Sequence, residues 1–375
     1  MAAPMMAPAP LVRAFKNVGI LTALAVVPAL MLAAYVAVAA RPGVRETVDF
    51  RVFYAAAKAY MHGRSPYPAH PATLTWAHGA QHSYAYPPIV AVVAIPFALL
   101  PYHVAAIVWV LIAAGAVGLS LWLLEIRDWR CYGAVYLWPA TLTAISVGTI
   151  STLLLLGIAT VWRFRSRTGA ASVAAVLTVS AKLFLWPLLV WLWLSGRRAV
   201  ATWAVLGTCL AAIVAWSIIR FDGITSYVSL LRRLSSVESR EGYSAAWAVA
   251  GTAGIGVIAA VCAAAAYRFR WRGRQALAAA VVAALLLTPI LWLHYLVLLA
   301  ATLPRRFSLL WLVPALLWLT PQQGSYGDAW RVALATAVLA VVAVGALKRE
   351  DAPWRLAEGL GGSHRRGADA GRSVS

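Results

Sequence analysis

The sequence is poor in charged residues. They make up 12% of its 375 residues, against roughly 25% in soluble domains. Hydrophobic residues make up 62%, and a water-soluble domain of this length could not hide so much apolar surface. The scarcity of charge therefore excludes an ordinary soluble protein and predicts an all-α polytopic membrane protein.

Acidic residues are scarcer still, because 12 of them oppose 32 basic residues and leave a formal net charge of +20. A strongly positive charge is typical of nucleic-acid binding, but such binding needs the basic residues clustered on a soluble face. Here they stand in small groups between long apolar runs. We therefore expect the lipid bilayer, and no nucleic acid, as a partner.

Cysteines, metal-ligand patterns and phosphate-binding loops are also scarce. Cys131, Cys209 and Cys262 lie in or beside apolar runs and have no paired spacing, so they predict no disulfide framework. No pair of outer-side acidic residues has metal-ligand spacing with histidines, and no Walker-type or dinucleotide motif is present. We expect no metal and no cofactor. The sequence also argues against a nucleotide-driven pump or a cytosolic sugar-nucleotide enzyme.

Long apolar runs, in contrast, fill residues 18–347. One membrane-spanning helix needs about 20 apolar residues, which leaves room for about twelve spans. The first run, Val18–Ala40, exceeds the roughly 7–15 apolar residues of a signal peptide. We expect a retained first helix, with a cleaved signal peptide as the alternative. Further on, either Ile89–Leu124 crosses once and Tyr132–Trp162, broken near Gly148, forms a hairpin, or the first stretch crosses twice and the second once.

Four basic clusters mark one side of this membrane domain. Arg and Lys prefer the cytoplasmic side of short loops, and an even number of expected crossings separates each cluster from the next. The N-terminal segment 1–17 and the basic tail 348–375, which we expect to be disordered, fit on that side of the plasma membrane too. The clusters are Arg163, Arg165 and Arg167; Arg197 and Arg198; Arg268, Arg270, Arg272 and Arg274; and Arg305 and Arg306.

Two long loops, 41–87 and 220–244, then lie on the extracytoplasmic side. The first contains a pattern that predicts a short amphipathic helix at the membrane surface, ended by Gly63. The apolar face holds Phe50, Phe53, Tyr54, Ala57 and Met61, and the polar face holds Arg51, Lys58 and His62.

Three ionisable residues stand out on this outer side. Asp49 precedes the amphipathic helix and is its N-cap, a general base at the membrane boundary, or both. Lys182 lies between two apolar runs, where it either snorkels or meets an anion. His294 lies in an apolar segment and is either structural or functional. Lys182 and His294 could together face a phosphate attached to a lipid.

Several short motifs, taken in their order and spacing, resemble the polyprenol-phosphate-dependent glycosyltransferases of actinobacteria, which have the GT-C architecture (glycosyltransferase family 87). The resemblance runs from about Val18 to Trp330. One departure is the pair Gly148-Thr149, where the family often has Gly-Gln. The motifs are Val48-Asp-Phe50, Gly63 to Tyr67, Tyr86-Pro-Pro88, Ala181-Lys-Leu-Phe184 and Thr288-Pro-Ile-Leu-Trp-Leu-His-Tyr295.

The resemblance implies a GT-C-type helical bundle and a role for each matched position. Asp49 matches the catalytic base, and His294 and Lys182 match positions close to the donor phosphate. A lipid phosphate is already a competent leaving group, so an inverting transfer needs only one carboxylate to take the acceptor proton. Cations near the departing phosphate would stabilise the charge that develops there.

Loop positions Tyr67, Tyr86 and Arg64 are expected, on the same resemblance, to contact the sugar or the lipid head. The implied reaction moves mannose from polyprenyl-phosphate mannose to an envelope glycolipid or lipoglycan, as an α-linkage, on the outer face of the plasma membrane. One alternative is arabinofuranosyl transfer from a polyprenyl phosphate. A second, from a different class, is a transporter or flippase of a lipid-linked or anionic solute.

Overall fold

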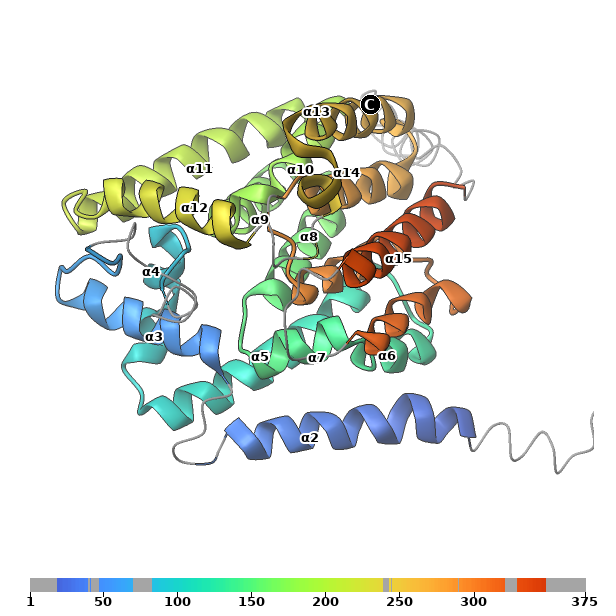
Figure 1. The fold of residues 1–375 in the computed structure, drawn as a ribbon, viewed down its shortest axis with the longest axis horizontal. Helices are drawn as coiled ribbons and strands as arrows, with labels where there is room; N and C mark the ends of the chain where they lie inside the picture. The colour runs from blue at the N-terminus through green and yellow to red at the C-terminus, as the bar shows by residue number, and fades with distance from the viewer. Residues whose placement is uncertain are drawn as a thin grey trace, which may run out of the picture.

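In the residues that the computed structural model describes, all regular secondary structure is helical (Figure 1). These are residues 19–39, 41, 47–69, 83–238, 243, 245–288, 290–320 and 329–348. The expectations for segment 1–17, for part of the first outer loop and for nearly all of the tail 348–375 lie outside the described residues.

Most of the helices follow one another with short connections, and several helices are far shorter than a membrane span. In chain order they are η1 (Thr22–Val26), α2 (Val27–Ala39), α3 (Val48–Met61), α4 (Pro88–Ala98), α5 (Tyr102–Leu123), α6 (Trp129–Tyr136), α7 (Pro139–Ser146), α8 (Ser151–Arg163), α9 (Thr168–Ala181), η5 (Leu183–Leu185), α10 (Pro187–Leu194), α11 (Arg198–Ile218), α12 (Ile224–Glu238), α13 (Ala245–Phe269), α14 (Gly273–Leu287), η6 (Leu293–Ala301), η7 (Leu309–Trp311), η8 (Val313–Leu319) and α15 (Ala329–Leu347).

Four helical segments in the described part are long and apolar enough to cross a membrane: Gly19–Val38, α5, α11 and α15. Helices α7 and α8 would together make a fifth, but they are bent by 114°. Other apolar helices are shorter. The 14 residues of α9 cover about 21 Å at 1.5 Å per residue, less than the roughly 30 Å hydrocarbon core. The chain is thus a multi-pass membrane protein, and about twelve spans remain a prediction.

The ambiguous stretch between residues 89 and 162 turns at two places. The helix is interrupted between α4 and α5 at residues 99–101, and the break in Tyr132–Trp162 lies at residues 147–150, where it was expected. Gly148 has a φ of +72°, which glycine adopts without steric penalty. Its carbonyl accepts a 2.8 Å hydrogen bond from Trp109 Nε1. How often the two runs cross the membrane stays a prediction.

The predicted amphipathic helix is α3. Phe50 and Phe53 are fully buried, Lys58 is exposed, and the chain leaves the helix at Gly63 with a φ of +64°. The apolar face is covered by protein, because Phe50 stacks on Trp109 of α5 with 5.1 Å between ring centroids. The rings of Phe50 and Phe97 of α4 also pack edge-to-face, with 6.0 Å between their centroids. Helix α3 is therefore docked on the bundle, and Met61, predicted on the apolar face, is 45% exposed.

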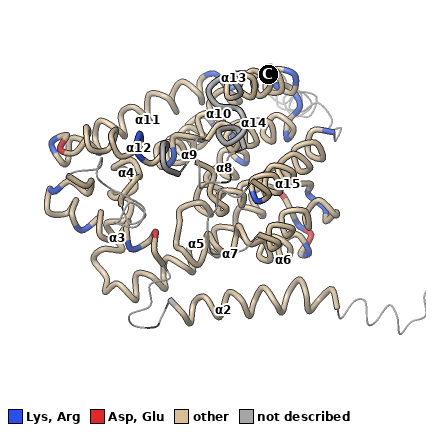
Figure 2. The backbone as a smooth tube through the Cα atoms, in the orientation of Figure 1, with Lys and Arg blue, Asp and Glu red and all other residues tan. Residues whose placement is uncertain are grey.

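The basic clusters meet although they are far apart in the sequence. Arg197 Nε donates a 3.1 Å hydrogen bond to the carbonyl of Arg165, and both line one small pocket with Arg270. Arg274 donates to the carbonyl of Leu303 at 3.1 Å, two residues before Arg305. Blue segments surround the ends of α13, α14 and α6 in Figure 2, on the side away from α3. All four clusters thus gather at one end of the molecule, here called the basic end.

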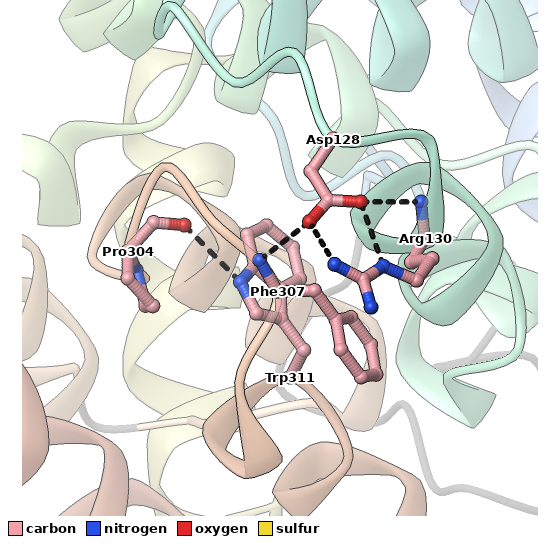
Figure 3. Close-up of polar contacts among 5 residues, drawn as sticks. All are labelled: Asp128, Arg130, Pro304, Phe307 and Trp311. Atoms are coloured by element: carbon pink, nitrogen blue, oxygen red, sulfur yellow. Dashed lines mark hydrogen bonds and ion pairs between the residues drawn. The ribbon is translucent and has the colours of Figure 1, made fainter.

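At the basic end, Asp128 joins the start of α6 to the segment before η7 (Figure 3). Its carboxylate caps α6 by accepting from the Arg130 backbone N–H at 3.2 Å. It also accepts from the Arg130 guanidinium at 2.9 Å and from the Phe307 backbone N–H at 3.0 Å. These donors, led by the Arg130 side chain, lower the pKa of Asp128 to about 2. The Asp128 junction therefore fixes two segments that are distant in sequence.

Candidate functional site

Asp49 lies in the first turn of α3 and faces the bend between α7 and α8. The N-cap interpretation is wrong, because the cap position belongs to Thr47 and α3 begins at Val48. The Asp49 backbone N–H donates a 2.9 Å hydrogen bond to the carbonyl of Val147. Its carboxylate Oδ2 accepts from the Tyr86 hydroxyl at 3.4 Å. The backbone of Asp49 is thus bound to the bend between α7 and α8. The Asp49 carboxylate does not cap α3 and can serve another role.

Gly148 allows this close approach. A Cβ built on Gly148 would lie 2.7 Å from the Phe50 Cβ, a separation that side-chain atoms do not tolerate. The next residue, Thr149, is fully buried and reaches both the Asp49 carboxyl and the Tyr86 hydroxyl with its side chain. The position at which the chain departs from the Gly-Gln pattern therefore lies beside Asp49.

Lys182 enters from the opposite side, just beyond the end of α9. Its Nζ donates a 2.8 Å hydrogen bond to the Tyr295 hydroxyl. The same ammonium group lies 3.8 Å from the ring centroid of Tyr86, a distance suited to a cation–π interaction. Tyr86 thus contacts the lysine through its ring and Asp49 through its hydroxyl. Four segments far apart in the sequence, those of Asp49, Tyr86, Lys182 and Tyr295, converge here.

His294 completes this group at the start of η6. Its ring meets the Tyr295 ring edge-to-face, with 4.6 Å between centroids. Its Nε2 is buried and has no hydrogen-bond partner within the described part of the chain. Buried polar atoms are normally hydrogen-bonded, so this nitrogen is unusual. We call Asp49, Tyr86, Lys182, His294 and Tyr295 the outer cluster.

Charge and burial oppose each other at the Asp49 carboxyl. Asp49 as a whole is only half-buried, but the protein around its carboxyl raises the pKa of that group above the usual 3.8, because burial disfavours the charged form. The positive charge of Lys182 and hydrogen bonds from Tyr86 and Thr149 act in the opposite direction. The net direction is upward, which moves the carboxyl toward the range where a general base works well.

The other two predicted contact residues lie elsewhere. Tyr67 is buried behind the outer cluster, where its hydroxyl donates a 2.8 Å hydrogen bond to the carbonyl of Tyr86. Its ring stacks on Trp216 with 5.3 Å between centroids, so it supports Tyr86 from behind. Arg64 is exposed beyond the far end of α3, about 20 Å along the helix from Asp49 at 1.5 Å per residue. The structure does not bring Arg64 to the outer cluster.

Two residues of this site were not predicted from the sequence. Tyr295, 4% exposed, is the last residue of the motif Thr288–Tyr295, in which His294 is the ionisable residue. Thr149 was noted only as a departure from a family pattern. Among the described residues, no three His, Cys, Asp or Glu side chains are close enough to hold a metal ion.

Comparison with known proteins identifies the family of the chain. Residues 84–291 match glycosyltransferase family 87. The matched range includes Tyr86 and Lys182 and excludes Asp49 and His294. No curated protein sequence and no solved structure matches the chain. Because the family match covers more than half of the 375 residues, this multi-pass membrane protein belongs to glycosyltransferase family 87.

Proposed function

We propose that the enzyme transfers mannose from polyprenyl-phosphate mannose to an envelope glycolipid or lipoglycan, with inversion, on the outer face of the plasma membrane. The observation that carries this proposal is the convergence of one carboxylate and one ammonium group on Tyr86. The Tyr86 hydroxyl reaches Asp49 at 3.4 Å, and its ring lies 3.8 Å below Lys182 Nζ. One base and one cation are what a single displacement from a phosphate needs.

The proposed step is a single in-line displacement. An acceptor hydroxyl oxygen forms a bond to the anomeric carbon while the bond from that carbon to the phosphate oxygen breaks. Asp49 takes the hydroxyl proton, and the leaving polyprenyl phosphate carries away the bonding electron pair. Lys182 stabilises the negative charge that grows on the phosphate. A β-linked donor gives an α-linked product.

His294 supports the phosphate side of this proposal. Its Nε2 is buried without a hydrogen-bond partner in the described part of the chain. A phosphate oxygen beside Lys182 would be the natural partner for such a donor. Tyr295 links Lys182 to His294, since it accepts the Lys182 hydrogen bond at 2.8 Å and contacts the His294 ring. We therefore assign Lys182 and His294 to the donor phosphate.

Family membership separates sugar transfer from solute transport, but it does not separate the two candidate sugars. Membership in a glycosyltransferase family agrees with sugar transfer and not with a carrier that moves a solute unchanged. Mannose and arabinofuranose both remain compatible with membership, and we choose mannose on the resemblance described above. The decisive experiment therefore compares both lipid-linked sugars.

Membranes containing the enzyme would be supplied with radiolabelled polyprenyl-phosphate mannose or polyprenyl-phosphate arabinose, and the linkage of any product determined. We expect mannose transfer, and we expect Asp49→Asn to lower its rate by about 10²–10⁴-fold, the usual contribution of a general base. Asp222→Asn is the matched control, because Asp222 is exposed in the turn between α11 and α12. Arabinose transfer alone would refute the choice of sugar, and full activity of Asp49→Asn would refute the catalytic base.

A further inference from the structure

A small pocket at the basic end collects three arginines from three separate connections between helices. Arg165 follows α8, Arg197 precedes α11, and Arg270 lies just beyond α13. All three residues are half-buried. Other arginines of the same clusters are exposed, namely Arg163, Arg167, Arg198 and Arg268. We call this site the arginine pocket.

Specific contacts hold the three guanidinium groups at the pocket. Arg197 Nε donates a 3.1 Å hydrogen bond to the carbonyl of Arg165, and the Arg165 guanidinium lies 4.1 Å from the ring centroid of Trp162. Arg270 donates to the carbonyl of Tyr267 at 2.6 Å and lies 3.7 Å from the centroid of its ring. Like charges that line one pocket repel each other, so the arrangement favours the binding of an anion.

The lining of the pocket contains no carboxylate to balance these charges. The sequence has no Asp or Glu between residues 129 and 221 or between residues 242 and 327, and these two stretches supply the pocket wall. Two acidic residues at the basic end are paired outside the pocket, because Asp128 binds Arg130 and Glu125 binds Arg305. A ligand can therefore supply the negative charge.

Two further features favour an anion with oxygen atoms. Trp162 is 3% exposed, and its Nε1 is buried without a hydrogen-bond partner in the described part of the chain. Buried polar atoms are normally hydrogen-bonded, and an indole N–H can only donate, so an acceptor oxygen suits this position. Gly273 and Ala276 of the pocket wall belong to the first turn of α14, and a helix N-terminus attracts anions.

The size and surroundings of the pocket suit a phosphate group carried by a lipid. The empty space is about 190 Å³ and includes the open mouth. It is too narrow to enclose a nucleotide, so a ligand would lie at the mouth with one oxygen directed inward. Trp193 of α10 and Tyr267 of α13 are 50% and 60% exposed near this mouth. Exposed Trp and Tyr residues concentrate at the level of lipid headgroups.

We propose that the arginine pocket binds the phosphate group of an anionic phospholipid in the leaflet at the basic end. Guanidinium groups form strong, charge-assisted hydrogen bonds with phosphate oxygens, and basic pockets between membrane helices bind phospholipid headgroups. The bound phosphate would join the connections 164–167, 195–197 and 270–272, and would thereby stabilise the adjoining helix ends. The site is separate from the outer cluster, so it does not depend on the proposed sugar transfer.

The test compares two adjacent arginines of equal charge. Arg197→Gln changes a residue of the pocket, whereas Arg198→Gln changes an exposed residue that does not line it. The purified full-length protein is titrated in uncharged detergent with phosphatidylglycerol or with zwitterionic phosphatidylcholine, at fixed ionic strength, and its melting temperature is measured.

We expect phosphatidylglycerol to raise the melting temperature of the wild type more than phosphatidylcholine does, because a ligand that binds only the folded state stabilises it. Arg197→Gln should raise the half-saturating mole fraction of phosphatidylglycerol at least tenfold, the effect of one lost hydrogen bond to a charged group. Arg198→Gln should leave that fraction unchanged. Equal stabilisation by the two lipids, or equal losses in the two variants, would overturn the proposal.

Two further comparisons keep the test decisive. If Arg197→Gln does not fold, Arg270→Gln is compared with Arg268→Gln, since Arg270 lines the pocket and Arg268 is exposed. Trp162→Phe removes the indole N–H, keeps an aromatic ring and should also weaken the response to phosphatidylglycerol. Inorganic phosphate is titrated in the absence of lipid. Equal stabilisation by inorganic phosphate would overturn the lipid as the source while leaving the arginine pocket as a phosphate site.

Discussion

At the scale of single residues, the charge of Lys182 and the burial of Asp49 set the protonation of the proposed base. Burial raises the pKa of the Asp49 carboxyl, and Lys182 lowers it less than burial raises it. A general base works only when ionised, so activity falls as the pH drops through this raised pKa. We expect the acid limb of kcat/KM at a higher pH than an ordinary aspartate with a pKa of 3.8 would give.

Lys182→Met provides the matching test of this coupling. Without the ammonium charge the pKa of Asp49 rises further, so the acid limb should move to higher pH while the overall rate also falls. The pH profile of kcat/KM in both enzymes measures the shift. Tyr86, Thr149, His294 and Tyr295 are the other polar groups at this site and are left in place. An acid limb at the same pH in both enzymes would show that Lys182 does not act on Asp49.

Tyr295 offers a second prediction at this scale, because its hydroxyl fixes the Lys182 ammonium group at 2.8 Å. Hydrogen bonds to charged groups contribute about 1.5–3 kcal/mol, so Tyr295→Phe should lower kcat/KM for the donor by roughly 10–100-fold. The control is Tyr54→Phe, which removes a hydroxyl that bonds to the carbonyl of Leu100 at 2.8 Å, outside the outer cluster. Equal losses in the two variants would argue against a positioning role for Tyr295.

The sequence allowed most of the outer cluster to be predicted, one residue at a time. Asp49, Lys182 and His294 are ionisable residues in apolar surroundings, and that contrast is visible without a structure. The hydrogen bond between Lys182 and Tyr295 spans 113 positions, and no local pattern encodes a contact of that range. The prediction that Arg64 joins the site was wrong, because closeness in sequence did not give closeness in space. It lies near Tyr67 in the sequence, but α3 carries it to the far end from Asp49.

At the scale of helices, the bend between α7 and α8 positions the start of α3. Gly148 has a φ of +72°, and a Cβ at this position would collide with the Cβ of Phe50. Gly148→Ala should therefore displace α3 from the bend, lower the melting temperature in detergent and reduce transfer at least tenfold. Gly115→Ala in α5 is the matched control, because a Cβ there meets nothing within 4 Å. Similar behaviour of the two variants would contradict a special fit at Gly148.

The Asp128 junction makes a separate prediction about stability. Asp128→Ala removes the cap of α6 and the acceptor for the Phe307 backbone N–H. A lost cap typically costs about 0.5–2 kcal/mol, so thermal unfolding in detergent should begin at a lower temperature. Asp128→Asn, which still caps a helix, should lose less. The junction lies at the basic end, so neither variant should alter the KM for the donor. A changed KM would show that the basic end is coupled to the outer cluster.

The pH dependence of the Asp128 contribution follows from its lowered pKa. The carboxylate stabilises the fold fully above the unfolded pKa of about 3.9, and the contribution disappears as the pH falls through about 2. At neutral pH the junction is therefore fully charged. The stability comparison of Asp128→Ala with Asp128→Asn can thus be made under the conditions of the activity assay.

The helices themselves were predicted unevenly. The period of α3 and the break at Gly148 are local signals, and both are present in the structure. Phe97 of α4 and Trp109 of α5 cover Phe50. They lie 47 and 59 positions away in the sequence, and a helical pattern cannot reveal contacts of that range. The 3₁₀ helices η6 and η8 replace expected α-helical runs. An apolar composition does not distinguish the two forms, because both bury the same side chains.

At the scale of the whole molecule, the two ends differ in chemistry. The four arginine clusters meet at the basic end, and the outer cluster with Asp49 lies at the start of α3. A cavity of about 640 Å³ between α4, α8 and α9 lies between them, since its lining includes both Ala181, which precedes Lys182, and Phe164.

This arrangement predicts an orientation in the membrane. The positive-inside rule places the basic end in the cytoplasm, so the outer cluster faces outward. In a background with Cys209→Ser, which removes the exposed native thiol, one new cysteine is introduced at a time. His62→Cys lies at the end of α3 and Ser166→Cys lies in the first basic cluster, and both positions are exposed.

A membrane-impermeant thiol reagent then reads the orientation in intact cells. The cysteine introduced by His62→Cys should react at once, and the one introduced by Ser166→Cys only after permeabilisation. The reverse pattern would place Asp49 in the cytoplasm and would exclude transfer on the outer face. Immediate reaction of both would place the two positions on one side of the membrane. The chain between them would then cross an even number of times, whereas the basic clusters and the outer cluster require an odd number.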